Sequence, residues 1–242
     1  MESGDTHRLI KITATKLRQV LALLAVNAGS TVGVERLIDE LWPAGPPNTV
    51  KTIVQTYVHQ LRKLFDKSFQ CARGTELLAT RPDGYMLDIP SDNVDVFRFQ
   101  SLIDRSRHEL RRDQPTCAAE LLHQALSLYR GPIAADITSG PALYSLSVLL
   151  EEHRLEAVSL RIEADLANNR HREIVGELRS LVVTHRLHES FYIKLMEALH
   201  RSGRRGEALT VYRDLSCVLD DELGLKPSPE ARRIQHEILL SK

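Results

Sequence analysis

One strongly amphipathic segment limits the fold of the first third of the chain more than any other feature. Its apolar residues recur at helical spacing, from Val50 through Val54 and Val58 to Phe65. This spacing predicts a helix over 48–67, about 30 Å long at a rise of about 1.5 Å per residue. The Pro- and Gly-rich stretch just before it cannot be helical, so the helix is expected to begin where that stretch ends.

Two shorter helical patterns precede this segment. The first covers Leu17 to Ala25 and is ended by a Gly-Ser break. The second covers Val34 to Leu41, with Gly33 as a candidate N-cap, and stops at Trp42-Pro43. A short strand is expected over 8–12, before the first helix.

A β-hairpin is predicted after the long helix. Its candidate strands, 76–80 and 85–89, flank the tetrapeptide Arg81-Pro82-Asp83-Gly84. Proline presets φ, aspartate bonds its own backbone, and glycine can take a positive φ, so this tetrapeptide is typical of a tight turn. Three helices followed by a hairpin is the order of a winged helix.

The rest of the chain is predicted to be helical throughout. Glu173 and Glu207 begin two similar segments that lie 34 residues apart, which is the period of tetratricopeptide repeats. We therefore expect a mainly α protein, in which a winged helix over 1–90 is followed by an all-helical, tetratricopeptide-like domain over 91–242. The predicted helices are 94–112, 115–129, 141–168, 171–185, 189–202, 204–222 and 228–240.

Positive charge is concentrated around the long predicted helix, although the whole chain is neutral. Lys plus Arg and Asp plus Glu both total 32, so overall charge does not indicate a nucleic-acid partner. Residues 46–81, however, contain six Lys or Arg against two acidic residues. The region after residue 90 has a small acidic surplus and no comparable basic stretch, so any nucleic-acid contact is expected from 46–81.

The residues off the apolar stripe of the long helix form one polar face, with neighbours three or four positions apart. Such a face is either an ordinary solvated surface or a surface that reads the DNA major groove, where amides and hydroxyls meet base edges and cations meet phosphates. Spacing alone leaves both interpretations open. The bulky aromatic residues Trp42, Tyr57 and Phe65 are expected in the core. The polar face contains Lys51, Thr52, Gln55, Thr56, His59, Arg62 and Lys63.

The chain lacks the sequence signatures of an enzyme, a metal centre or a membrane protein. It has no GxxxxGK[ST] phosphate loop, no GxSxG elbow and no HExxH pair. Cys71, Cys117 and Cys217 are far apart and odd in number, which favours a reduced cytoplasmic setting over disulfides or a metal pair. The apolar run over 20–26 is far shorter than the roughly 20 residues of a membrane span. We expect no enzymatic activity, no cofactor, no metal site and no membrane partner.

Several motifs together resemble the Streptomyces antibiotic regulatory protein family of transcriptional activators. The most specific are LIDELW over 37–42, YVHQLRKL over 57–64, and DELGL over 221–225 with PSPE over 227–230. The resemblance implies an OmpR-type winged helix joined to a bacterial transcriptional activation domain. Family members usually have several N-terminal strands, whereas only 8–12 is available here.

The resemblance also implies a function and partners. A member of this family is expected to bind direct repeats in double-stranded DNA near a promoter, with protomers side by side, and to recruit RNA polymerase to a secondary-metabolite biosynthetic cluster. It favours the DNA-reading interpretation of the long helix and likens Arg81 to a wing arginine that enters the minor groove. The expected DNA contacts are Asn48, Lys51, Thr52, Gln55, Thr56, His59, Arg62, Lys63 and Arg81.

A function of another class stays open at this point. Helical repeats form concave surfaces for protein partners, so the chain could be an interaction scaffold that does not bind DNA. Salt-sensitive binding to duplexes distinguishes the two functions. A response-regulator effector half is disfavoured, because no receiver-like βα pattern precedes the predicted winged helix.

Overall fold

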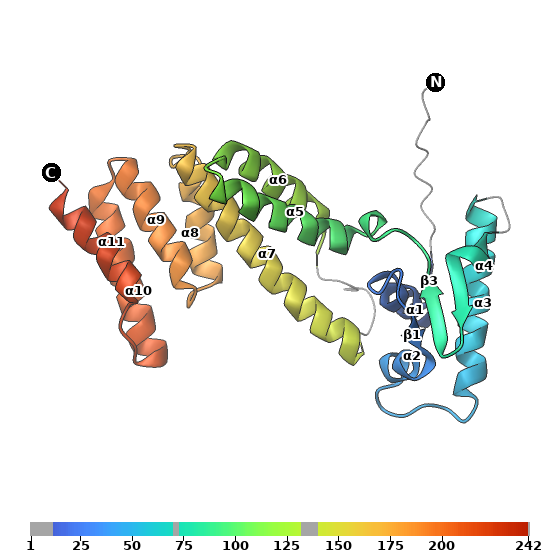
Figure 1. The fold of residues 1–242 in the computed structure, drawn as a ribbon. Helices are drawn as coiled ribbons and strands as arrows, with labels where there is room; N and C mark the ends of the chain where they lie inside the picture. Colours follow the sequence, from blue (N-terminus) through green and yellow to red (C-terminus); the bar gives the residue numbers. More distant parts are fainter. Residues whose placement is uncertain (1–11, 70–72, 132–139, 242) are drawn as a thin grey trace, which may run out of the picture. The chain divides into compact units, whose positions relative to one another are not determined.

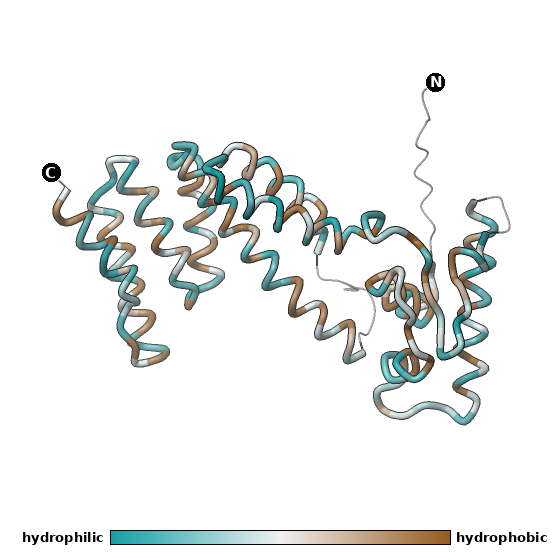
Figure 2. Tube along the Cα trace, in the orientation of Figure 1, coloured by the Kyte–Doolittle hydropathy of each residue, from teal (hydrophilic) through white to brown (hydrophobic). Residues whose placement is uncertain are grey.

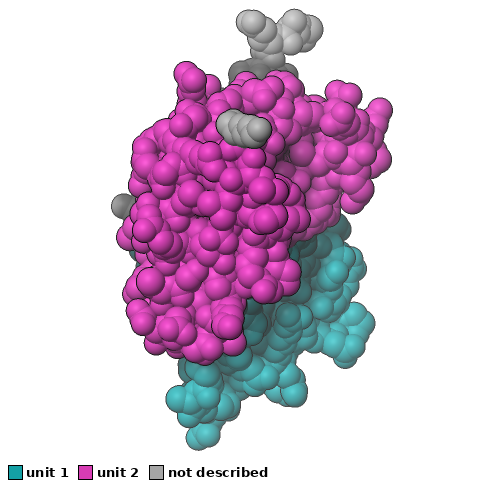
Figure 3. Space-filling view, turned by 90° about the vertical axis from the view of Figure 1, so that its left-hand side faces the viewer, with its two compact units in different colours: residues 1–101, 127–154 teal, residues 102–126, 155–242 magenta. Residues whose placement is uncertain are grey.

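The computed structural model describes residues 12–69, 73–131 and 140–241. It divides into two compact units, which we call unit 1 and unit 2 and describe separately (Figure 1). The mainly α architecture, a winged helix followed by helices, is confirmed. The strand expected over 8–12 lies outside the described residues, except for Ile12. Unit 1 comprises 1–101 and 127–154, and unit 2 comprises 102–126 and 155–242 (Figure 3).

The three helices predicted at the start of unit 1 are present. They are α1 (Thr15–Ala25), α2 (Val34–Leu41) and α3 (Val50–Phe69). Gly33 is the N-cap of α2, as expected. The apolar stripes of these helices meet in one core, where Leu24, Leu37, Val54 and Leu61 are at most 1% exposed.

The wing is a three-stranded antiparallel sheet in the order β1-β3-β2. The predicted hairpin is confirmed as β2 (Leu78–Arg81) and β3 (Gly84–Leu87). Its first strand begins later than predicted, because the short helix α4 (Gly74–Leu77) occupies the start of the expected strand. The added strand β1 (Val32–Gly33) pairs with β3, and its two residues are too few to give a sequence pattern.

Gly84 is needed in the wing for a different reason from the one predicted. It is not among the glycines with positive φ. A Cβ built on Gly84 would lie 2.0 Å from the carbonyl oxygen of Val32. Glycine therefore allows β1 and β3 to approach closely.

The chain after the wing contains a 3-10 turn, η1 (Ser91–Asn93), and seven helices in the described residues. The predicted helices agree with these within one or two residues, except that the one predicted over 171–185 begins at Val175. Helices α5 and α7 each begin in unit 1 and continue into unit 2. The helices are α5 (Asp95–Arg111), α6 (Pro115–Leu128), α7 (Pro141–Ala167), α8 (Val175–Thr184), α9 (Glu189–Arg201), α10 (Arg205–Leu223) and α11 (Pro229–Leu240).

Helix α9 is the centre of the core of unit 2. It packs against α8, α10 and α11, and its residues Phe191, Met196 and Leu199 are fully buried. Hydrophobic residues alternate with hydrophilic ones along these helices (Figure 2), as helices with one buried face require. The similar segments 34 residues apart thus belong to α8 and α10, the first helices of two successive helix pairs.

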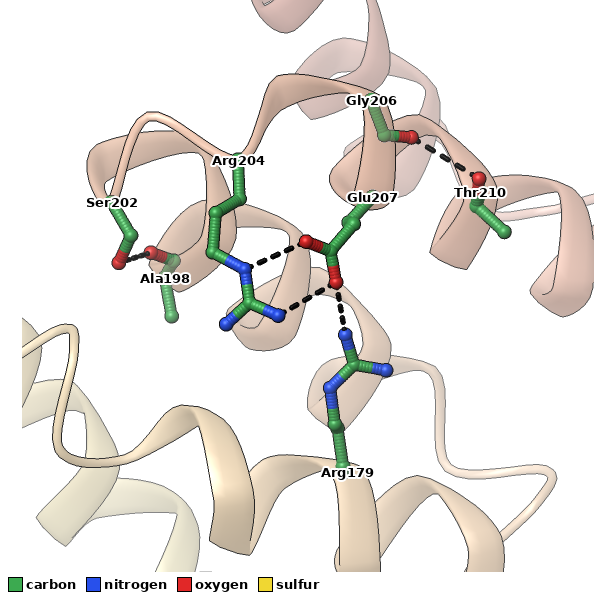
Figure 4. Close-up of polar contacts among 7 residues, drawn as sticks. All are labelled: Arg179, Ala198, Ser202, Arg204, Gly206, Glu207 and Thr210. Carbon is green, nitrogen blue, oxygen red and sulfur yellow. Dashed lines mark hydrogen bonds and ion pairs between the residues drawn. The ribbon is translucent and has the colours of Figure 1, made fainter.

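An exposed ion-pair network joins these two equivalent helices. Arg179 of α8 and Arg204, the N-cap residue of α10, both point toward Glu207 (Figure 4). The Glu207 carboxylate accepts hydrogen bonds from Arg204 Nε at 2.8 Å and from Arg179 Nη2 at 2.6 Å. The hydrogen bonds and charge of Arg204, and then those of Arg179, lower the pKa of Glu207.

A second ion-pair network in unit 2 is buried. Arg161 and Asp165, both on α7, are 6% and 3% exposed. Arg161 Nη1 lies 2.8 Å from Asp165 Oδ2, and its Nη2 lies 2.5 Å from Glu177 Oε1 on α8. One guanidinium thereby connects α7 to α8.

Candidate nucleic-acid interface

Helix α3 presents a polar face away from the core of unit 1. On its inner side, Val54, Val58 and Leu61 are at most 1% exposed and Phe65 is 8% exposed. The opposite side consists of exposed polar residues: Lys51, Thr52, Gln55, Thr56, His59 and Lys63. Asn48, also exposed, lies in the turn just before the helix.

Four of these side chains form a continuous row along α3. Lys51, Gln55, His59 and Lys63 follow each other at intervals of four residues, which places them on one face of the helix. Within the described part of the chain, no hydrogen bond or ion pair engages their side chains. Their donors and acceptors are thus available to a partner. Beside the row, the Thr56 hydroxyl donates to the carbonyl of Thr52 at 2.9 Å and retains its acceptor capacity.

Arg62 differs from the rest of the predicted set because it is half-buried and engaged. Its Nε and Nη2 donate to the carbonyl oxygen of Leu78 at 2.9 and 2.6 Å, and Nη2 also donates to Thr80 Oγ1 at 2.8 Å. Both acceptors belong to β2. The guanidinium therefore fixes the wing to α3.

Two further contacts hold the start of the hairpin against α3. The Asp66 carboxylate accepts from the backbone N–H of Gly74 at 2.7 Å. A Cβ at Gly74 would lie 2.3 Å from the carbonyl oxygen of Arg62, so only glycine permits this approach. Helix and wing thus form one connected surface.

A substitution of Arg62 distinguishes two roles of this residue, fixing the wing to α3 and binding a DNA phosphate. In Arg62→Met, the buried carbonyl of Leu78 loses its side-chain donor, and we expect unit 1 to lose about 1–3 kcal/mol of stability. We expect the salt dependence of duplex binding to stay unchanged, because Nε and Nη2, two of the three guanidinium nitrogens, are directed at Leu78 and Thr80 of the wing. Urea denaturation and a sodium chloride titration measure the two effects. A decrease of about one unit in the slope of log affinity against log salt concentration would instead identify Arg62 as a phosphate contact.

The second candidate contact surface is the tip of the wing. Arg81 is exposed at the end of β2, next to the two-residue loop Pro82-Asp83. Its Nη2 lies 3.9 Å from the sulfur of Met86, and no carboxylate pairs with it among the described residues. The charge of Arg81 is therefore free to meet an anion.

The aromatic residues predicted for the core do pack there. Trp42 and Tyr57 are partly buried against the core of unit 1 and stack with ring centroids 6.4 Å apart. The Lys16 ammonium lies 5.4 Å from the centroid of the Trp42 ring. These rings hold α2 against α3 and are not available to stack on bases.

The described residues contain two free thiols and no candidate metal cluster. They contain no group of three or more His, Cys, Asp or Glu that could hold a metal ion. Cys117 and Cys217 are exposed free thiols, and Cys71 lies outside the described residues. Across those same residues, no helix is long and apolar enough to cross a membrane.

Sequence reasoning missed one further polar cluster in unit 1. The Glu40 carboxylate, at the end of α2, accepts hydrogen bonds from backbone N–H groups at the start of α7. Some 100 residues separate the partners, and backbone donors carry no residue signature, so no sequence pattern could have revealed this contact.

Comparison with known families assigns both parts of the chain. Residues 8–87 match the family model "Transcriptional regulatory protein, C terminal", and residues 94–239 match "Bacterial transcriptional activator domain". The first model covers α1 to β3, including the polar face and the wing. The second covers the helices from α5 to α11.

Similar proteins are regulators from Streptomyces and Mycobacterium species. Regulatory protein DnrI of Streptomyces peucetius is 37% identical over 93% of this chain and 84% of its own length. Transcriptional regulator RedD of Streptomyces coelicolor is also 37% identical, over 94% of this chain and 65% of its own. A solved structure of Mycobacterium tuberculosis EmbR, in complex with a low-affinity phosphopeptide, has a TM-score of 0.87 at 32% identity. It matches 94% of this chain, which spans 59% of the EmbR chain.

Proposed function

Because this chain belongs to the Streptomyces antibiotic regulatory protein family of transcriptional regulators, we propose that it activates transcription by binding a promoter through α3 and the wing. The observation that supports this most is the unengaged row of Lys51, Gln55, His59 and Lys63 beside a hairpin anchored to the same helix. The relatives and the family models describe regulators of transcription rather than enzymes.

The proposed division of roles follows from side-chain chemistry. Gln55 and Thr56 lie near the middle of the exposed face and have the amide and hydroxyl groups that read base edges. Lys51 and Lys63 lie on either side of Gln55, four and eight residues away, and meet phosphates. Arg81 enters the minor groove from the wing, where the negative potential is strong, and meets the phosphates beside it. Asn48, Thr52 and His59 complete the contact surface, while Arg62 supports the wing.

Two partners are proposed from the family. A second copy binds side by side on a direct repeat, and RNA polymerase is recruited to the adjacent promoter of a biosynthetic cluster. Helices α8 to α11 form a helical-repeat surface of the kind that binds protein partners. Transcription in vitro with purified polymerase, with and without this protein, tests recruitment.

The central test is selection of bound duplexes from a random pool. We expect one enriched motif, present as two direct copies at a fixed spacing, and affinity that falls steeply with salt. If no motif is enriched and the amount of duplex retained by the protein does not depend on salt, the result would support the scaffold function in place of DNA binding.

Gln55→Ala tests which residue reads sequence. A bidentate amide contact with adenine discriminates by about 1–3 kcal/mol, so we expect preference at one base pair to relax while affinity for random duplexes changes little. Gln114→Ala is the control, since Gln114 is an exposed amide outside α3 and the wing. Equal weakening on every sequence would assign Gln55 a structural role. Competition binding against single-substitution duplexes measures the difference.

A further inference from the structure

The cluster around Glu40 is the most unusual polar feature of unit 1. Glu40 lies in the last turn of α2 and is only 1% exposed. Burying a carboxylate is costly unless hydrogen bonds replace its lost water. Its two oxygens therefore require strong donors.

Backbone N–H groups at the start of α7 supply these donors. Oε1 accepts from Gly140 at 2.7 Å, and Oε2 accepts from Ala142 at 2.8 Å and from Leu143 at 3.3 Å. Pro141 has no N–H group. The N–H of Tyr144 donates to the carbonyl of Gly140 at 3.0 Å and so begins the helical ladder. Glu40 thus satisfies every donor that the first turn of α7 leaves unpaired.

The surrounding packing is fitted to this contact. A Cβ on Gly140 would lie 2.2 Å from the carbonyl oxygen of Glu40, so no larger residue fits there. Leu143 is 0% exposed, and Ala142 packs against the core shared by α1, α2 and α3. The start of α7 is therefore an integral part of the unit that contains the proposed DNA-reading surface.

We propose that Glu40 is a positioning residue that locks the first turn of α7 onto the winged helix. Helix α7 continues without a break from unit 1 into unit 2, so the same helix that is held by Glu40 also enters the core of the repeat helices. This contact couples DNA binding by the winged helix to activation by the repeat helices. The coupling, unlike the contact itself, rests on the proposed function. The favourable end of the helix dipole offsets the buried negative charge.

The contact requires a carboxylate in particular. In Glu40→Gln, one side-chain oxygen becomes an NH₂ group, so two donors face each other where one acceptor is needed. Asp39 is an exposed neighbour on the same helix, and Asp39→Asn removes the same charge without touching α7. Gly140→Ala disturbs the contact from the α7 side and leaves the Glu40 carboxylate intact.

Hydrogen–deuterium exchange of the full-length protein tests the lock without DNA. In Glu40→Gln and in Gly140→Ala we expect amides 142–146 to exchange roughly tenfold faster, the factor for losing a hydrogen bond to a charged group. Peptides of α3 should keep their protection, and Asp39→Asn should match the wild type. Unchanged exchange in both variants would overturn the proposal, as would an equal increase in α3, which would indicate general destabilisation.

A second measurement tests the coupling and separates it from the proposed function. With promoter DNA saturated by protein, we expect Glu40→Gln to retain wild-type duplex affinity and to lose transcript yield relative to Asp39→Asn. A loss of duplex affinity that accounts for the loss of transcript would overturn the coupling. If the wild type itself binds no duplex, the proposed function fails, while the exchange experiment still decides whether Glu40 locks α7.

Discussion

Replacing Asp165 with alanine is expected to lower the free energy of unfolding by about 3 kcal/mol. Breaking a buried ion pair on one side typically costs about 3–5 kcal/mol, because the remaining charge stays buried without compensation. Here Arg161 keeps one partner, Glu177, whose side chain is 45% exposed, which places the cost at the lower end. Urea denaturation followed by circular dichroism measures the change.

The structure offers a control with the same spacing on an exposed surface. Arg233 and Glu237 are also four residues apart, with Nη1 and Oε1 at 2.6 Å, but their side chains are 59% and 54% exposed. Glu237→Ala should therefore cost about 0.5 kcal/mol or less. The double variant Arg161→Met, Asp165→Leu should be more stable than Asp165→Ala, because it removes the buried charge as well. If the two single variants lose equal stability, the burial argument is wrong.

The features that the sequence predicts best are those with a repeated local signal. The helices from α5 to α11 have apolar residues at a regular period and breaks at proline, glycine or asparagine, and most of their bounds agree within two residues. The hairpin has a specific turn sequence. For α3, alternation of buried and exposed residues also separates Val54 and Val58 from Lys51 and Gln55, and so predicts which side chains are exposed.

The features that could not be predicted depend on contacts between distant residues. Strand β1 exists because Val32 pairs with Tyr85, and a two-residue strand has no period. The sequence places Arg62 on the polar face of α3 with Lys63 and predicts a DNA contact for both, which stays a prediction, but it does not reveal that Arg62 holds the wing. Only the path of β2 shows that the Leu78 carbonyl lies within 2.9 Å of Arg62 Nε. The contact between Glu40 and α7 could not be predicted for the same reason, because its partners are distant in the sequence.

The charges of Lys51, Lys63 and Arg81 are expected to supply much of the affinity for DNA, and removing all three should have the largest effect on function. Each phosphate contact contributes a slope of about −0.9 to the dependence of log affinity on log salt concentration. Three contacts amount to about 2.7 units of slope, and thus to about a 500-fold loss of affinity at 0.1 M salt. The alanine triple variant should lose affinity to this extent for random and specific duplexes alike. Fluorescence anisotropy at several sodium chloride concentrations measures both slope and affinity.

A triple variant in unit 2 distinguishes local contacts from the effect of net charge. Arg213, Lys226 and Arg232 are exposed, and replacing them with alanine changes the net charge of the chain by the same amount. If α3 and the wing carry the phosphate contacts, this variant should keep the wild-type slope, because a charge that touches no phosphate releases no counterion. Equal losses in the two variants would mean that the field of the whole molecule attracts DNA and that the basic residues of α3 have no special role. A loss confined to Lys51, Lys63 and Arg81 would place the phosphate contacts on α3 and the wing, since only these positions are changed in that variant.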